Sequence, residues 1–182
     1  ASGVSGLQAQ TPDYQQMFDE HWLPQVEEVL KRGDYQNVEI ASREGQRRGK
    51  DGAAWNMLRF QALNAMGDRD DLKEEIPKAL SQSPEHLPLL MLAHDLWLEL
   101  GEPEKASDIL AGFNEVALKK PLKDRTALEL VALGRGAHAL GAEPSRVLDE
   151  FYAAAQKKEP TLIEGYLAAG NLALEKYDYA RA

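Results

Sequence analysis

The sequence predicts an all-α protein, an α-solenoid of antiparallel helix hairpins, and two observations carry this prediction. A glycine-centred turn recurs every 34 residues, at Gly33, Gly67 and Gly101, and a fixed period of this length is typical of stacked helical repeats. Apolar residues on both sides of each turn fall at the three- and four-residue spacings of amphipathic helices. Each glycine suits a helix end, where the chain turns with a positive φ.

The first three units are expected at residues 19–52, 53–86 and 87–128, the third enlarged by an insertion. An apolar stripe before each turn predicts a first helix, and its main residues are Val26, Val29, Leu30, Trp55, Leu58, Leu63, Leu89, Leu92 and Leu96. A stripe after each turn predicts a second helix, with Val38, Ala41, Leu72, Ile76, Ala79, Ala106, Ile109 and Phe113. Pro24 and Pro77 fall inside these patterns, where proline removes a backbone donor, so a kink or a break is expected at each.

The last two units are expected at residues 129–162 and 163–182. The step from the third to the fourth first helix is about 42 residues, which predicts an insertion of about eight residues near 119–124. Gly134 and Gly136 form a Gly-x-Gly without a preceding strand or a third glycine, so they indicate close helix packing rather than a phosphate loop. The fifth unit stops at its turn, and we expect a truncated repeat there.

Residues 1–12 are small and polar, and we interpret them as a flexible leader or the remnant of a signal peptide cleaved after Ala9. This favours a periplasmic or exported protein, with a cytoplasmic one as the alternative. The net charge of −9 argues against a nucleic-acid partner, which would need a basic surface. The chain has no cysteine and no run of about 18 apolar residues, so neither a thiolate metal site nor a membrane span is expected.

From about residue 19 to residue 182, the chain resembles the tetratricopeptide repeat (TPR) family, in which small, large and proline residues recur at fixed positions of a 34-residue unit. The fourth unit matches best, with Gly136, Leu148, Tyr152, Ala155 and Pro160. The other units match more loosely, and their departures from the pattern are Val26, Phe60 and His94 at a normally small position and Ser42 at a large one. The resemblance implies a right-handed superhelix of about four and a half hairpins.

The resemblance also implies a concave groove, lined by the first helices, that binds a peptide or helix of another protein. The side chains it places there are Leu23, Glu27, Met57, Gln61, Asn64, Met91, Asp95, Leu98, Leu133, Leu167, Asn171 and Leu174. This mixture of polar and apolar groups suits peptide recognition. A basic clamp for a terminal carboxylate is missing, because Leu23, Met57 and Met91 stand where the family's carboxylate binders have lysine.

The first function hypothesis is therefore a non-catalytic interaction scaffold with no cofactor and no metal, whose protein or peptide partner the sequence does not identify. No two histidines have the spacing of metal ligands on one helix face, and His94, next to Asp95, is expected to be a core or boundary residue. An alternative is an accessory or regulatory region of a larger, exported enzyme with a catalytic domain beyond residue 182. Self-association through an exposed C-terminal helix is a further expectation.

Overall fold

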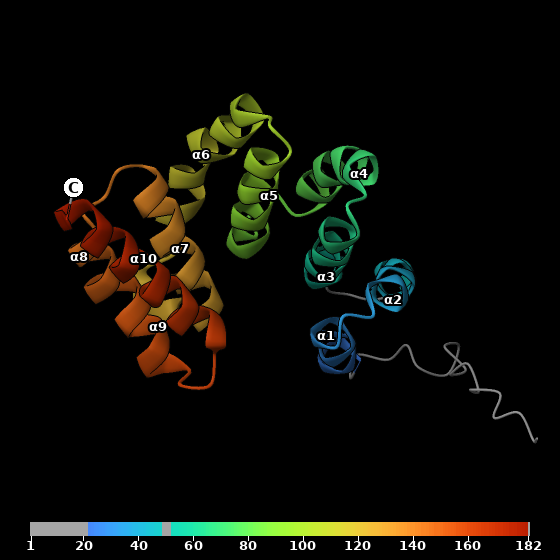
Figure 1. Cartoon of the computed structure of the whole chain (residues 1–182), viewed down its shortest axis with the longest axis horizontal. Helices are drawn as coiled ribbons and strands as arrows, with labels where there is room; N and C mark the ends of the chain where they lie inside the picture. Colours follow the sequence, from blue (N-terminus) through green and yellow to red (C-terminus); the bar gives the residue numbers. More distant parts are fainter. Residues whose placement is uncertain (1–21, 49–51, 182) are drawn as a thin grey trace, which may run out of the picture. The chain divides into compact units, whose positions relative to one another are not determined.

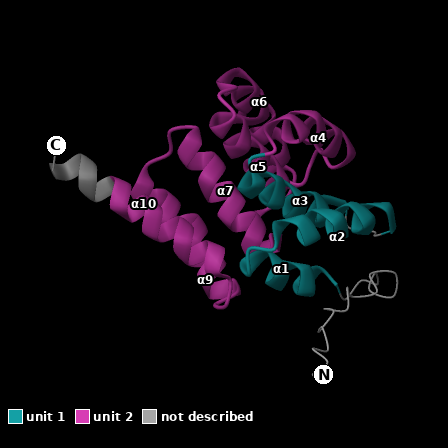
Figure 2. Cartoon of the chain, turned by 45° about the vertical axis from the view of Figure 1, so that its right-hand side comes forward, with its two compact units in different colours: residues 1–67 teal, residues 68–182 magenta. Residues whose placement is uncertain are grey.

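The computed structural model describes residues 22–48 and 52–181, with side chains up to Glu175 in the last helix. Within these residues the chain is all-α and contains no strand, as the periodicity predicted. It divides into two compact units, residues 1–67 and 68–182 (Figure 2). The expected leader, residues 1–12, lies outside the described residues.

Unit 1 contains α1 (Leu23–Lys31), α2 (Tyr35–Arg48) and α3 (Gly52–Met66). The chain turns between α1 and α2 at Gly33, whose φ of 81° confirms the expected glycine turn. The core is shared by all three helices and consists of Val26, Val38, Ala41, Trp55, Leu58 and Ala62. Pro24 does not break α1, because the helix begins at Leu23 and the backbone N–H groups of the first turn have no intrahelical partner to lose.

Unit 2 begins with α4 (Arg69–Gln82), α5 (Leu87–Glu99) and α6 (Pro103–Leu118). Helices α5 and α6 form a hairpin around Gly101, which has a φ of 76°. Helix α4 continues through Pro77, so the expected break does not occur. The predicted insertion follows α6 as an irregular segment with one 3-10 turn, η2 (Leu122–Asp124).

The rest of unit 2 is a second hairpin and one more helix. Helix α7 (Ala127–Ala139) pairs with a single continuous helix made of α8 (Pro144–Val147), the π-helical turn η3 (Leu148–Tyr152) and α9 (Ala153–Lys158), and α10 (Ile163–Arg181) follows. A Cβ on Gly134 would collide with the ring of Tyr152, and one on Gly136 with the ring of Phe113. The Gly-x-Gly therefore serves close helix packing, as predicted.

The fourth helical repeat, expected at residues 129–162, starts at a different residue from the expected one. Gly141 is a fourth glycine turn, with a φ of 89°, and it follows Gly101 by 40 residues, six more than the 34-residue period. Helix α7 accordingly begins at Ala127, two residues before the start expected near Glu129. The remaining two extra residues lie between Gly141 and α10, in the stretch whose helix contains the π-helical turn η3. The eight additional residues are thus divided between two places.

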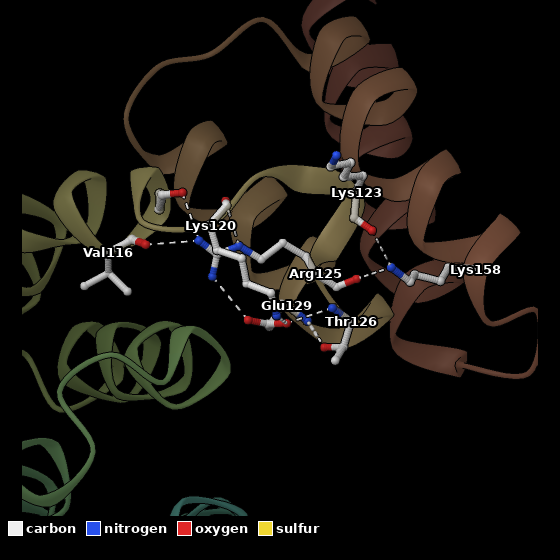
Figure 3. Close-up of polar contacts among 8 residues, drawn as sticks. Val116, Lys120, Lys123, Arg125, Thr126, Glu129 and Lys158 are labelled. Carbon is white, nitrogen blue, oxygen red and sulfur yellow. Dashed lines mark hydrogen bonds and ion pairs between the residues drawn. The ribbon is translucent and has the colours of Figure 1, made fainter.

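A buried arginine holds the inserted segment against the preceding helix (Figure 3). Arg125, 4% exposed, donates to the carbonyl oxygens of Val116 at 3.1 Å, Ala117 at 3.0 Å and Lys120 at 3.2 Å, and pairs with Glu129 at 3.2 Å. The carbonyls of Val116 and Ala117 lie in the last turn of α6, where a helix leaves its acceptors without partners in a following turn, and Val116 also accepts from the Lys119 N–H at 3.3 Å. Because all these partners are within the chain, we interpret Arg125 as a structural clamp that fixes the start of α7.

Two further contacts secure the same segment. Thr126 and Glu129 form a reciprocal capping box at the start of α7, in which the Glu129 carboxylate accepts from the Thr126 backbone at 2.7 Å. Lys158, at the end of α9, donates to the carbonyl oxygens of Lys123 and Arg125 (Figure 3). The phase of α7, and hence of its surface residues, is therefore set by polar contacts from both sides.

Candidate functional site

Three first helices of unit 2 lie side by side, with α7 packed against both α5 and α10 (Figure 1). Asp95, Arg135 and Asn171 each occupy the ninth position of their helix. Leu98, His138 and Leu174 each occupy the twelfth, one turn further on. Residues three or four apart lie on the same side of a helix. We call these six residues, with Glu175, the inner face.

The centre of the inner face is an ion pair between neighbouring helices. Arg135 of α7 pairs with the Asp95 carboxylate of α5, and the two side chains are 40% and 32% exposed. His94, which is buried, lies 2.8 Å from the same carboxylate through its Nδ1. The Asp95 carboxylate is thus held from two sides, which fixes its position before any partner arrives.

The protonation of His94 follows from this environment. Burial lowers its pKa below the ordinary 6.5, and the positive charge of Arg135 lowers it further. The ring is therefore neutral at pH 7, and because a carboxylate only accepts hydrogen bonds, its Nδ1–H donates to Asp95. This confirms the expectation that His94 is a core or boundary residue.

A second polar contact links α7 to α10. The Nε2 of His138 lies 3.3 Å from a carboxylate oxygen of Glu175. Tyr152 is buried against Gly134. Burial raises the pKa of its phenol; the charge of Arg135 opposes this rise, and the charge of Glu175 adds to it. The phenol therefore stays protonated and adds no charge to the inner face.

Exposed leucines flank these charges. Leu98 on α5 is 50% exposed, and Leu174 on α10 is 66% exposed. An exposed leucine beside a fixed, partly exposed ion pair offers a partner both apolar contact and directed hydrogen bonds, the combination that peptide-binding surfaces use.

The predicted groove residues do not all lie on this surface. In unit 1, α1 and α3 pack together and carry Leu23 and Met57, both half-buried, with Glu27, Gln61 and Asn64 exposed. In unit 2, Asp95, Leu98 and Asn171 lie on the inner face. Leu174 also lies on the inner face, and Leu167 is exposed on the same helix. Met91 and Leu133 are 2% and 4% exposed and pack in the core of unit 2, so their assignment to the groove was wrong.

Sequence reasoning missed Arg135, His138 and Glu175. Arg135 and His138 were overlooked because the fourth unit was expected two residues too late, which assigned other α7 residues to the exposed positions. Counting from Gly141, fifteenth in its unit as Gly101 is in the third, would have found both. Glu175 carried no signal of its own, because its role depends on His138.

Among the described residues, no group of three histidine or acidic side chains is placed to hold a metal ion. None of the described helices combines the length and apolar character that crossing a membrane requires. In the comparisons with known proteins, no family model, no curated protein and no solved structure matches the chain.

Proposed function

We propose that the chain is a TPR-like interaction scaffold, without catalytic activity of its own, that binds a peptide or helix of a partner protein on the inner face. Four glycine turns with positive φ and the hairpins around them support the repeat assignment. Stacking of such hairpins into a right-handed superhelix is part of the proposal. Each hairpin has an apolar face that only a neighbour can cover, which favours stacking.

The Asp95–Arg135 pair is the observation that carries this proposal. Its two side chains come from different helices, and His94 holds the carboxylate at 2.8 Å. Binding to a pair that is already fixed costs less conformational entropy than binding to a site whose two long side chains must first be ordered. The exposed Leu98 next to the pair supplies the apolar contact area that a hydrogen-bonding pair alone lacks.

The test is a selection of binders from a displayed library of random dodecapeptides, with the whole chain as bait. Selected peptides are then measured for affinity against Leu98→Asp and against Leu118→Asp. Leu118 is a matched control, because it is 86% exposed at the end of α6 and lies outside the inner face. Both changes place a new carboxylate on an exposed position, so both variants are expected to fold.

We expect Leu98→Asp to weaken peptide binding at least about tenfold, or about 1.4 kcal/mol, and Leu118→Asp to leave it unchanged. Asp95→Asn should lower the affinity for the same peptides, because it removes the negative charge that orients Arg135. Equal affinities for the parent chain and Leu98→Asp would contradict the inner face as the binding surface. A selection that enriches no peptide would count against the scaffold function itself.

Self-association is a second candidate, favoured by the exposed apolar side chains of α10. This helix exposes Ile163, Tyr166, Leu167 and Leu174, each at least half exposed. An apolar stripe of this kind invites pairing. Sedimentation of the chain beside Leu167→Lys tests it: a dimer that the lysine dissociates would support the candidate, and a monomer at all concentrations would remove it.

A further inference from the structure

A concave surface of unit 2 lies between helices α4 and α6, and its lining includes no residue of the inner face. It is a groove of about 520 Å³, and α5 forms its floor. Its apolar lining comes from all three helices and includes Pro77, Leu80, Trp97, Ile109, Gly112 and Val116. This volume lies within the range of about 300 to 1,000 Å³ that ligand sites span, which is room for a few side chains rather than a whole helix.

Gly112, in the wall of this groove, has no close packing partner among the residues that the structure describes. A Cβ on Gly45, Gly134 or Gly136 would collide with an aromatic ring, but a Cβ on Gly112 would meet nothing within 4 Å. Glycine inside a helix is unfavourable compared with alanine. Pro77, also an unfavourable residue inside a helix, lines the same groove from α4. The groove is thus lined by Gly112 and Pro77, two residues that each lower the stability of the helix they belong to.

The charges around the groove are not balanced. Lys119 pairs with Glu85 at 2.5 Å. Lys105 lies 4.4 Å above the centre of the Trp97 ring and pairs with Glu102 at 3.5 Å. Asp108 lies one turn before Gly112 on α6 and lines the groove, and within the described part of the chain it has neither a hydrogen bond nor an ion pair. The groove therefore offers a carboxylate without a counter-charge.

We propose that this groove binds a segment of a partner protein that places a lysine or arginine among aliphatic side chains. The aliphatic groups fill the space beside Gly112, over Ile109. The alkyl stem of the basic residue lies along the apolar wall, and its cationic head pairs with Asp108, as long basic side chains do at the edge of apolar surfaces. Charge complementarity selects this occupant, because both lysines of the groove already have acidic partners.

The probe is a fluorescently labelled octapeptide with one lysine among leucines and alanines, and its twin has glutamate in place of the lysine. Affinities are measured by fluorescence anisotropy with the whole chain. Gly112→Leu fills the groove at a position with free space, and Gly112→Ala is its matched control, because it changes helix propensity with little filling. Circular dichroism checks that both variants keep their helices.

We expect the lysine peptide to bind at least about tenfold more tightly than its glutamate twin. Gly112→Leu should abolish this binding, and Gly112→Ala should keep it. Asp108→Asn should remove the preference for lysine. No binding of the lysine peptide up to millimolar concentration, equal binding to Gly112→Leu, or an unchanged preference in Asp108→Asn would each overturn the proposal.

Leu98→Asp separates this site from the inner face. If the lysine peptide binds in the groove, its affinity is the same for Leu98→Asp and for the parent chain. A loss of affinity in Leu98→Asp, together with no effect of Gly112→Leu, would place the peptide on the inner face and refute the groove.

Discussion

Replacing Arg125 with alanine tests whether the arginine clamp holds unit 2 together. The guanidinium makes hydrogen bonds of 3.0 to 3.2 Å to three carbonyl oxygens and to the Glu129 carboxylate. Alanine removes all of them: the Ala117 carbonyl loses this donor, and the Val116 carbonyl keeps the Lys119 N–H at 3.3 Å. Glu129 keeps contacts to Thr126 and Lys120, so no isolated carboxylate remains.

The expected loss follows from these contacts. A hydrogen bond from a charged donor contributes about 1.5 to 3 kcal/mol, but bonds from one guanidinium are not additive, and its burial costs part of the gain. The freed carbonyls lie near a helix end that water can reach. We therefore expect a loss of about 3 kcal/mol in the free energy of unfolding, or a fall in Tm of roughly 6 to 12 °C for a chain of this size.

Arg146→Ala is the matched control for this measurement. Arg146 is exposed and pairs with Glu150 four residues on, at 3.0 Å, an arrangement that contributes at most about 0.5 kcal/mol. Urea unfolding followed by circular dichroism compares both variants with the parent chain. Arg125→Lys should be intermediate, because it keeps the charge and loses the fork that reaches several acceptors. If Arg125→Ala lost no more stability than Arg146→Ala, the clamp would have no structural role.

Three other predictions concern packing and pH. Gly136→Ala should lower stability by about 1 to 3 kcal/mol because its Cβ collides with the ring of Phe113, and Gly112→Ala should raise it by up to about 1 kcal/mol, both measured by urea unfolding. A gain in stability for Gly136→Ala, or a clear loss for Gly112→Ala, would contradict the packing described for that glycine. His94 should titrate below pH 6.5 in proton NMR. Between this lowered pKa and about pH 6.5 the unfolded chain binds more protons than the folded one, so stability falls as the pH drops through that range. His94→Gln should lose this part of the pH dependence of stability. An unchanged pH dependence in the variant would refute the assignment of a lowered pKa to His94. Ser42→Ala should raise stability by about 1 kcal/mol, since the hydroxyl is buried without a partner among the described residues, and a clear loss in thermal unfolding would show a hidden acceptor.

The helix hairpins were predictable because their signals are local. Gly33, Gly67 and Gly101 have the positive φ that a helix-ending turn requires, and apolar spacing marks the helices around them. The close approach at Gly134 and Gly136 was also predictable, since glycine inside a helical stripe is unfavourable unless a neighbour needs the space.

The phase of α7 was not predictable from the repeat length. The total of eight additional residues was right, but they are divided between the segment before α7 and the second half of the fourth unit, which contains the π-helical turn. Counting 34 residues back from Ile163 gives Glu129 as the start of the fourth repeat, because this count omits the two extra residues in the second half of that repeat. Counting back from the glycine turn at Gly141 instead gives Ala127, the actual start of α7, and this places Arg135 and His138 on the inner face.

Burial was the other limit of sequence reasoning. The TPR resemblance placed Met91 in the groove, but the side chain is 2% exposed and packs in the core of unit 2. Contacts between side chains of different helices, such as the pair of Asp95 and Arg135, leave no pattern in a single sequence. They became visible only with the helices placed side by side.

The most direct test of the central claim is to map a selected peptide on the isotope-labelled chain by NMR. The proposal predicts that the largest amide shift changes occur at Asp95, Leu98, Arg135 and Asn171, on three different helices of one face. Changes confined to unit 1, or to the groove between α4 and α6, would contradict the inner face as the partner-binding surface of this protein.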